Sequence, residues 1–301
     1  MQRLKRGLYW AGLLLGGGLF LYQLWVGLKG LQGISFGWKS VLQLAAATAL
    51  MLMVVGLQML NWRFILVAFG FKIRLGQIFE GYVLSFLPRY IPGSVWGYLS
   101  RSEWLHQQHQ VPYLVSNVSS LIEVGASFLT CVMVTGLITG PRFPVAVLGV
   151  LGLSVASWLV VRRAARLFLL RNPKWQRIGA SLLGLSWGAW VGWLLNCLVQ
   201  WFLLGWVTLL CVAAVGGSFS TQWALAASVF GLAWFIGLVI LFVPAGLGVR
   251  EFAFKNFLQL FLVVPNPIAA LAVVLIRLLY SFAELTWLLG ALLVKRLIRA
   301  R

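Results

Sequence analysis

The stretch FLPRYIPGSVWGYLSR, Phe86–Arg101, places two prolines, two glycines and two arginines inside sequence that is otherwise apolar. A second stretch, FVPAGLGVREFAF, Phe242–Phe254, combines a proline and two glycines with adjacent Arg250 and Glu251. Proline removes a helix hydrogen bond and glycine destabilises a helix interior, so each stretch predicts an interruption of a helix. The sequence around these two interruptions decides the fold.

The composition predicts an all-α polytopic membrane protein. Of the 301 residues, 61% are hydrophobic and 10% are charged, and the mean hydropathy is +0.95. A water-soluble domain has no place for so much apolar surface. Apolar runs of about 20 residues, the length that crosses a bilayer as a helix, recur along the chain. We therefore expect one integral membrane domain over residues 1–301. Its predicted spans are 8–28, 40–61, 112–139, 144–162, 182–212 and 266–294.

The distribution of lysine and arginine predicts the orientation of these spans. Basic residues cluster in the amino-terminal tail, in 62–77, in 162–177 and at the carboxyl end, whereas the alternate connections carry few. By the positive-inside rule, the clusters face the cytoplasm. The first apolar run lacks a small-residue cleavage site, which favours a retained span. We expect both termini to be cytoplasmic, in the inner (cytoplasmic) membrane of a prokaryote.

The two interrupted regions, 76–106 and 221–263, are each long enough to enter the membrane twice as half-helices. The basic clusters fix the side on which the neighbouring spans begin and end. The first region must therefore enter and leave the membrane on the inside, and the second on the outside. The chain then consists of two inverted-topology repeats, about 1–140 and 141–301, each with three spanning helices and a Pro/Gly-broken re-entrant hairpin. In secondary transporters, matching interrupted segments of this kind mark the transport site. The alternative is that both prolines are ordinary kinks in tilted spanning helices.

The acidic residues are few and lie in unusual places. All five are glutamates; Glu123 and Glu284 fall inside predicted spans, where a charge marks a pathway or an ion pair. Arg277 precedes Glu284 by about two helical turns, so the two share a helix face but are too far apart for a tight pair and could contact the hairpins instead. Arginines beside the interruptions offer bidentate phosphate contacts, and half-helix amino termini attract anions. The alternative is that these charges form structural Arg–Glu pairs.

Other features of the sequence are explained by helix packing and membrane topology. Gly184, Gly188 and Gly192 recur at four-residue spacing, which predicts a helix-packing face, and the tryptophans interleaved with them are expected to face lipid or the interface. Glu103, His106 and His109 are too few and wrongly spaced for a metal site, so no metal and no cofactor is predicted. The net charge of +19 is explained by the basic clusters between spans, and we expect no nucleic-acid partner.

The two interruptions, with VVLIRLLYSFAELTWLLGALL after the second, resemble the family of lysylphosphatidylglycerol synthase transmembrane domains, also described as flippase-like membrane proteins. The resemblance implies movement of a lipid between leaflets: an aminoacylated phosphatidylglycerol in the named members, or isoprenoid-linked sugars in stand-alone relatives. This sequence departs from the full synthase because it has no soluble catalytic domain. Together with the charge argument, the resemblance implies a substrate or transport cavity formed by Arg89, Pro92, Gly93, Arg101, Glu123, Pro244, Gly246, Gly248, Arg250, Glu251, Arg277 and Glu284.

The function predicted first is a flippase or transporter of an anionic lipid, either an aminoacyl phospholipid or a polyprenyl-phosphate-linked sugar. Its partners are then membrane lipids with anionic headgroups, together with an envelope-lipid synthase or glycosyltransferase. Two alternatives stay open: a membrane glycosyltransferase that uses a lipid-linked sugar, and a non-catalytic membrane partner of an envelope-lipid enzyme. The enzyme is disfavoured because the sequence has no aspartate and no sizeable outward loop on which to place catalytic groups. The sequence does not determine the oligomeric state.

Overall fold

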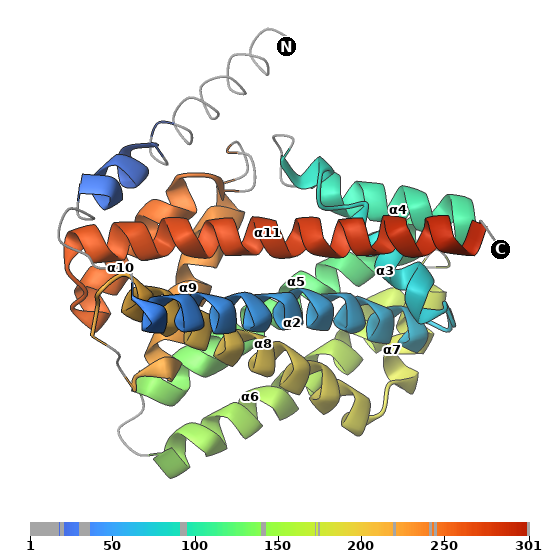
Figure 1. Cartoon of the computed structure of the whole chain (residues 1–301). Coiled ribbons are helices and arrows are strands. Elements are labelled where there is room, and N and C mark those ends of the chain that lie inside the picture. The colour runs from blue at the N-terminus through green and yellow to red at the C-terminus, as the bar shows by residue number, and fades with distance from the viewer. Residues whose placement is uncertain are drawn as a thin grey trace, which may run out of the picture.

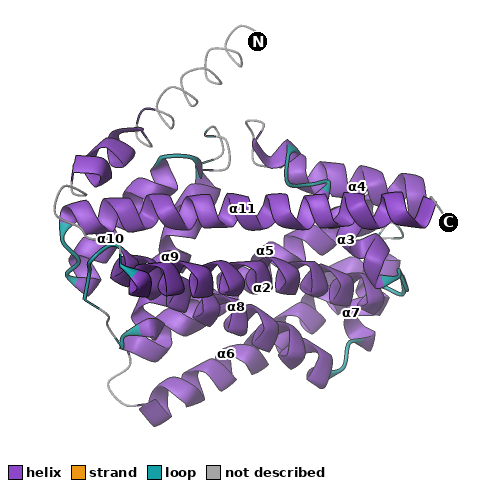
Figure 2. Cartoon of the chain, viewed as in Figure 1, coloured by secondary structure: helices purple, strands orange, loops and turns teal. Residues whose placement is uncertain are grey.

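The computed structural model is helical and contains no strand in the residues it describes, namely 18, 21–29, 37–90, 95–139, 143–171, 173, 175–218, 221–240, 243 and 246–299. Figure 2 shows helices joined by short connections throughout this part of the chain. The all-α class predicted from composition is confirmed. The predicted cavity residues Pro92, Gly93 and Pro244, and most of the predicted span 8–28, lie outside the described residues.

Four helices of the described chain are long and apolar enough to cross a membrane. They coincide with four predicted spans, and they identify the chain as an integral membrane protein. A fifth predicted span, 144–162, is also a helix, α6 (Phe143–Ala164), although it is not among those four. The four are α2 (Trp38–Ala68), α5 (Tyr113–Thr139), α8 (Trp187–Ala214) and α11 (Asn266–Arg299).

The predicted span 182–212 is wrong at its beginning. After α6, a π-helical turn η3 (Ala165–Leu169) leads to the short helix α7 (Gln176–Gly184), and α8 starts only at Trp187. The backbone of Leu185 is extended, and the Ser186 hydroxyl accepts a hydrogen bond of 3.2 Å from the Ala189 N–H. A serine at this position caps the amino terminus of a new helix and so separates α8 from α7.

The faces predicted for the first half of α8 are wrong for two of its three tryptophans, whereas Trp187 is exposed as expected. Trp190 and Trp193 are buried, and the Trp190 indole donates to the Ser157 hydroxyl of α6 at 3.3 Å. Gly188 and Gly192 are exposed, and a Cβ built at either would meet no described atom within 4 Å. A large indole gains more than a glycine from contact with neighbouring helices, so Trp190 and Trp193 occupy the interior.

Both interrupted regions contain two helices with a break between them. In the first, α3 (Leu75–Val83) is followed by a single 3-10 turn η2 (Pro88–Tyr90) and then by α4 (Trp96–His109). In the second, α9 (Trp223–Val239) is followed by α10 (Val249–Leu262). The interruptions predicted from proline and glycine are therefore present at both places.

The second interruption depends on glycine for its shape. Gly246 and Gly248 have φ angles of +66° and +78°, which side-chain-bearing residues rarely adopt. A Cβ at Gly246 would also lie 2.9 Å from the Cα of Gly237 in α9. The chain before α10 thus passes directly against the end of α9.

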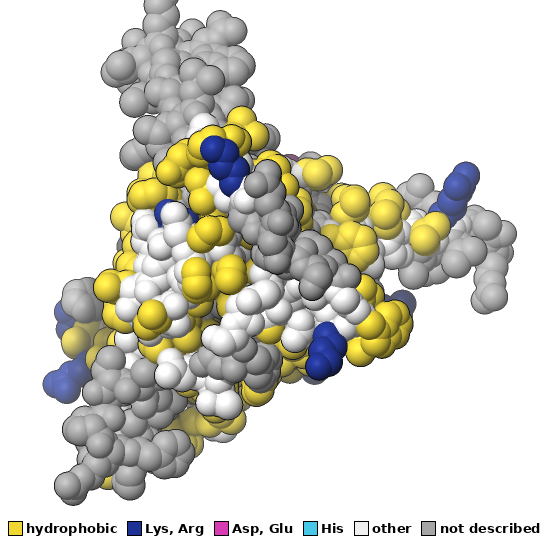
Figure 3. All heavy atoms as spheres, turned by 60° about the vertical axis from the view of Figure 1, so that its left-hand side comes forward, with side chains coloured by type: hydrophobic (Ala, Val, Ile, Leu, Met, Phe, Trp, Pro, Cys, Tyr) yellow, Lys and Arg dark blue, Asp and Glu magenta, His cyan; other side chains and the backbone are white. Residues whose placement is uncertain are grey.

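The long helices form a bundle around α2 and α8, which pack extensively on each other. In Figure 1, α11 and α2 run side by side along the bundle, and α6 lies at its edge. Side chains of α2 such as Met51, Val54 and Trp62 are fully buried. The outer face of α11 instead exposes Leu278, Phe282 and other large apolar residues, and Figure 3 shows hydrophobic side chains spread over one face of the molecule. Exposed apolar surface on spanning helices fits contact with lipid.

Candidate functional site

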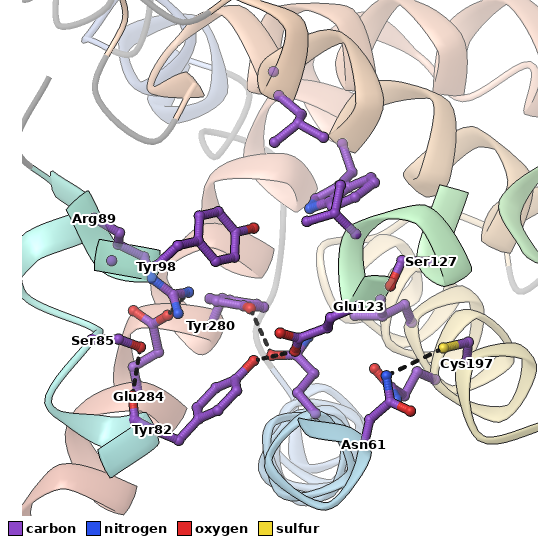
Figure 4. A pocket seen from close by; sticks show the side chains of 18 of the residues that line it. Asn61, Tyr82, Ser85, Arg89, Tyr98, Glu123, Ser127, Cys197, Tyr280 and Glu284 are labelled. Carbon is purple, nitrogen blue, oxygen red and sulfur yellow. Dashed lines mark hydrogen bonds and ion pairs between the residues drawn. The ribbon is translucent and has the colours of Figure 1, made fainter. Parts of the chain in front are cut away.

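A cavity of about 180 Å³ lies where both interrupted regions meet the long helices. Its lining comes from α2, α3, α4, α5, α8, α9, α10 and α11 and from the first interruption. In Figure 4, Arg89, Tyr98 and Glu284 lie on one side of this space, and Asn61, Ser127 and Cys197 lie on the other. The volume is several times the roughly 30 Å³ that a water molecule occupies in the liquid. The cavity can therefore hold a small polar group together with water.

Arg101 of α4 and Glu123 of α5 form a buried ion pair with 2.9 Å between the guanidinium and carboxylate groups. The Tyr82 hydroxyl donates to the other Glu123 oxygen at 3.0 Å. The Arg101 guanidinium also lies 4.6–5.0 Å from the ring centres of Tyr82, Trp62 and Tyr98. Rings at this distance attract a cation and exclude water from it. This pair fastens the second helix of the first interrupted region to the long helix that follows it.

Glu251 and Arg277 form the corresponding contact in the second half of the chain. Their carboxylate and guanidinium groups are 3.5 Å apart, and both side chains are buried. The other Glu251 oxygen accepts a hydrogen bond of 2.6 Å from the Gly248 N–H, at the beginning of α10. A carboxylate in the first turn satisfies a free N–H and interacts favourably with the helix dipole. The pair thus fastens the start of α10 to α11.

A third ion pair joins the two halves of the chain. Arg89, in the turn that interrupts the first region, contacts Glu284 of α11 at 2.5 Å. The Glu284 side chain is 5% exposed, whereas that of Arg89 is 25% exposed. Arg277 and Glu284 therefore each contact an interrupted region and not each other, in agreement with their spacing in the sequence.

Arg250, the second residue of α10, is held by aromatic rings. Its guanidinium carbon lies 5.2 Å from the ring centre of Phe230 and 5.7 Å from that of Tyr280. The aliphatic part of its side chain passes over Gly237, where an added Cβ would approach Arg250 Cβ to 2.8 Å. Gly237 therefore leaves room for the arginine to reach the cavity.

The structure brings together most of the predicted residues that it describes. Arg89, Arg101, Glu123, Arg250, Arg277 and Glu284 line the cavity. Gly246, Gly248 and Glu251 are not among its lining residues; they shape and cap the start of α10. Counted over the described lining, four arginines face two glutamates.

Sequence reasoning missed the neutral polar residues of the site. Tyr280 donates to the Gln58 amide oxygen at 3.2 Å, and Asn61 of α2 lies opposite Cys197 of α8. Tyr280 could have been found, because it lies three residues after Arg277 and four before Glu284, on the same helix face. Asn61 and Gln58 gave no such signal, since they are isolated amides in an apolar run.

The residues considered for a metal site lie apart from the cavity. Glu103 is exposed in the middle of α4, where it accepts hydrogen bonds from Gln107 and from the Tyr113 hydroxyl. The His106 ring stacks on Tyr113 with 4.2 Å between ring centres. Among the described residues, no group of three or more histidine, cysteine, aspartate or glutamate side chains could hold a metal ion.

The chain matches no protein-family model, and neither a curated protein nor a solved structure is found to be similar to it.

Proposed function

We propose that this protein moves an anionic lipid between the two leaflets of a membrane and that the cavity receives the lipid headgroup. The observation that carries the proposal is a cavity lined by four arginines, Arg89, Arg101, Arg250 and Arg277, that both interrupted regions help to line. Arginine offers planar, bidentate hydrogen bonds that match phosphate, so this lining supports binding of a phosphate-bearing headgroup. The lipid tails would stay in the surrounding bilayer.

The contacts between helices support two structural repeats. The α2 and α8 helices pack on each other, α5 contacts α8 and α9, and α11 makes the matching contacts with α2 and α3. The matching also holds at the edges: α6 packs on α5, and Gly27 of the first helical segment lies against Leu271 of α11. Exchange of the two halves of the chain turns the α2–α8 contact into itself and each of the other contacts into another of the set.

The ion pairs follow the same exchange with the signs reversed. In the first half, an arginine of α4 pairs with a glutamate of α5; in the second half, a glutamate of α10 pairs with an arginine of α11. We propose that the repeats are inverted in the membrane and that both interrupted regions are re-entrant. Irregular backbone at membrane depth is tolerated where it borders protein or a wet cavity, which is where both interruptions lie. Movement of one repeat against the other would expose the cavity to each side in turn.

Reconstitution into liposomes tests this function. Fluorescent phosphatidylglycerol, aminoacyl phosphatidylglycerol and polyprenyl phosphate are followed for leaflet accessibility with the wild type, Arg250→Ala and the control Lys72→Ala, which changes an exposed cation outside the cavity. We expect movement of at least one lipid that is lost in Arg250→Ala and retained in Lys72→Ala. No movement of any lipid by folded, inserted wild-type protein would contradict the proposal.

A further inference from the structure

Resting on the proposed function, we infer that Asn61 of α2 binds a hydroxyl group of the lipid headgroup. The cavity then selects a phosphate diester whose substituent carries hydroxyls, such as glycerol or a sugar. The Asn61 residue is 2% exposed and lines the cavity. In Figure 4 it lies on the side of the cavity opposite Arg89 and Glu284. This side offers contacts for the neutral part of a headgroup, whereas the arginines offer contacts for its phosphate.

The Asn61 amide is poorly satisfied by the protein itself. Its Oδ1 atom is buried and has no hydrogen-bond partner in the described part of the chain, and its Nδ2 atom donates only to the Cys197 thiol, at 3.6 Å. Sulfur is a weak acceptor. A buried polar group that stays unpaired destabilises a fold, so its presence in a cavity wall points to a group that enters the cavity.

The chemistry of an amide decides which group it can bind. Its oxygen accepts hydrogen bonds and its nitrogen donates them, and a hydroxyl can do both in return. An ammonium group only donates and an ionised phosphate oxygen only accepts, so each would leave one end of the Asn61 amide unsatisfied. Hydroxyls therefore match Asn61 better than the ammonium of an aminoacyl group or the phosphate itself.

Two further amides line the cavity on the central helices α2 and α8. Gln58 lies about one turn before Asn61 on α2, and its amide oxygen accepts a hydrogen bond of 3.2 Å from the Tyr280 hydroxyl. Gln200 of α8 donates from its amide nitrogen to Asn196 at 2.9 Å. Because α2 and α8 pack extensively on each other, these neutral polar groups belong to the central pair of helices.

Aromatic rings complete this part of the lining. Trp201 of α8 and Trp234 of α9 both line the cavity, with 5.7 Å between their ring centres. The Trp201 indole nitrogen already donates to the Thr130 hydroxyl and to the Ser127 carbonyl, at 3.0 and 3.1 Å, so the ring offers the cavity apolar surface. The C–H groups of glycerol or of a sugar can pack on such surface while their hydroxyls reach an amide.

Equilibrium binding to the full chain in nanodiscs of phosphatidylcholine tests the inference. The probes are phosphatidylglycerol and phosphatidylmethanol, two phosphate diesters of equal charge, of which only the first carries hydroxyls on its substituent. We expect the wild type to bind phosphatidylglycerol about tenfold more tightly, the effect of satisfying one buried amide. Equal affinity for the two lipids would overturn the inference without the need for any variant.

Asn61→Leu and Asn117→Leu form a matched pair of variants. Asn117 of α5 is not among the lining residues, and its side-chain oxygen accepts a hydrogen bond of 2.6 Å from the Ser102 hydroxyl. We expect the preference for phosphatidylglycerol to disappear in Asn61→Leu and to stay about tenfold in Asn117→Leu. A preference retained in Asn61→Leu would show that the amide does not contact the headgroup.

Thermal unfolding of the same two variants separates ligand binding from a structural role. Asn61→Leu replaces a poorly satisfied amide with an apolar group of similar size, so its melting temperature is expected to be no lower than that of the wild type. Asn117→Leu removes a satisfied amide and is expected to lower the melting temperature. An equal loss of stability in Asn61→Leu would assign Asn61 to helix packing and contradict the inference.

The binding assay separates this inference from the proposed function because it requires no transport. An Asn61-dependent preference for phosphatidylglycerol without transbilayer movement of any lipid would reject the transport function and leave the hydroxyl site standing. Movement of phosphatidylglycerol and phosphatidylmethanol at equal rates, with equal affinities, would do the reverse. Monoglucosyl diacylglycerol, which has hydroxyls but no phosphate, is measured in parallel and is expected to bind more weakly than phosphatidylglycerol. Equally tight binding of this lipid would overturn the choice of a phosphate diester.

Discussion

Arg101 shows how a single residue can be both costly and necessary in this fold. Its guanidinium is surrounded by three aromatic rings and neutralised by Glu123, which in turn accepts a hydrogen bond from Tyr82. A buried pair of this kind adds little net stability compared with a well-packed apolar pair. The loss of one partner, however, leaves the other charge uncompensated in surroundings of low dielectric constant. The residue therefore fixes the position of α4 more than it stabilises the bundle.

A double-mutant cycle on this pair tests that interpretation. Arg101→Ala and Glu123→Ala are each expected to lower the free energy of unfolding by about 3–5 kcal/mol, because each leaves an uncompensated buried charge. The double variant should be no less stable than the worse single variant. Thermal unfolding in a single detergent measures all three, and additive losses in the double variant would show that the two charges are independent.

At the scale of elements, the approach of α9 to the start of α10 depends on two glycines. Gly237 of α9 faces the Arg250 side chain, and a Cβ added at Gly237 would lie 2.8 Å from Arg250 Cβ. Gly246 faces the backbone of Gly237, and a Cβ added at Gly246 would lie 2.9 Å from Gly237 Cα. A helix that carried a larger residue at 237 would have to move away from the interruption. The element geometry thus sets where Arg250 enters the cavity.

Gly237→Ala is therefore expected to displace Arg250 and weaken the site. Overpacking of this kind costs about 1–3 kcal/mol of unfolding free energy, and we expect lipid movement to fall at the same time. Gly125→Ala in α5 is the matched control, since a Cβ there meets no described atom within 4 Å. Thermal unfolding and the liposome assay are measured on both; equal behaviour of the two variants would show that the close approach is unimportant.

Some element boundaries and faces could not be predicted because the apolar runs carry little internal contrast. In the run from Leu182 to Val212, serine and glycine at 184–186 give a local break that an averaged hydropathy window does not resolve. The same run carries glycines on one face and tryptophans on the opposite face. Either face is apolar enough to contact lipid. Only the neighbours that α8 meets decide which face is interior.

At the scale of the whole molecule, the proposed inverted repeats make opposite predictions for two connections. Lys72, between α2 and α3, belongs to a basic cluster expected inside, whereas Ser218, after α8, is expected outside. Both residues are exposed, while the native Cys131, Cys197 and Cys211 are buried. Single cysteines at these two positions can therefore report the side of the membrane on which each lies.

We expect Lys72→Cys to react with a membrane-impermeant maleimide only from the inside and Ser218→Cys only from the outside. Oriented vesicles and whole cells provide the two directions of labelling, and a protein without introduced cysteines gives the background. Labelling of both positions from one side would rule out the inverted arrangement and favour kinked spanning helices.

The sequence by itself determined that this chain is a membrane protein and at which residues its long apolar helices occur. It also determined that two regions are interrupted and that a small set of charges is buried. These follow from local properties: hydropathy over about 20 residues, and the backbone limits of proline and glycine. The tertiary structure alone decided which charges meet. Arg89 and Glu284 are 195 residues apart in the chain, and Arg277 contacts Glu251 instead of its own helix neighbour. Such pairings depend on how the helices pack against one another, a property that is not written in any one segment.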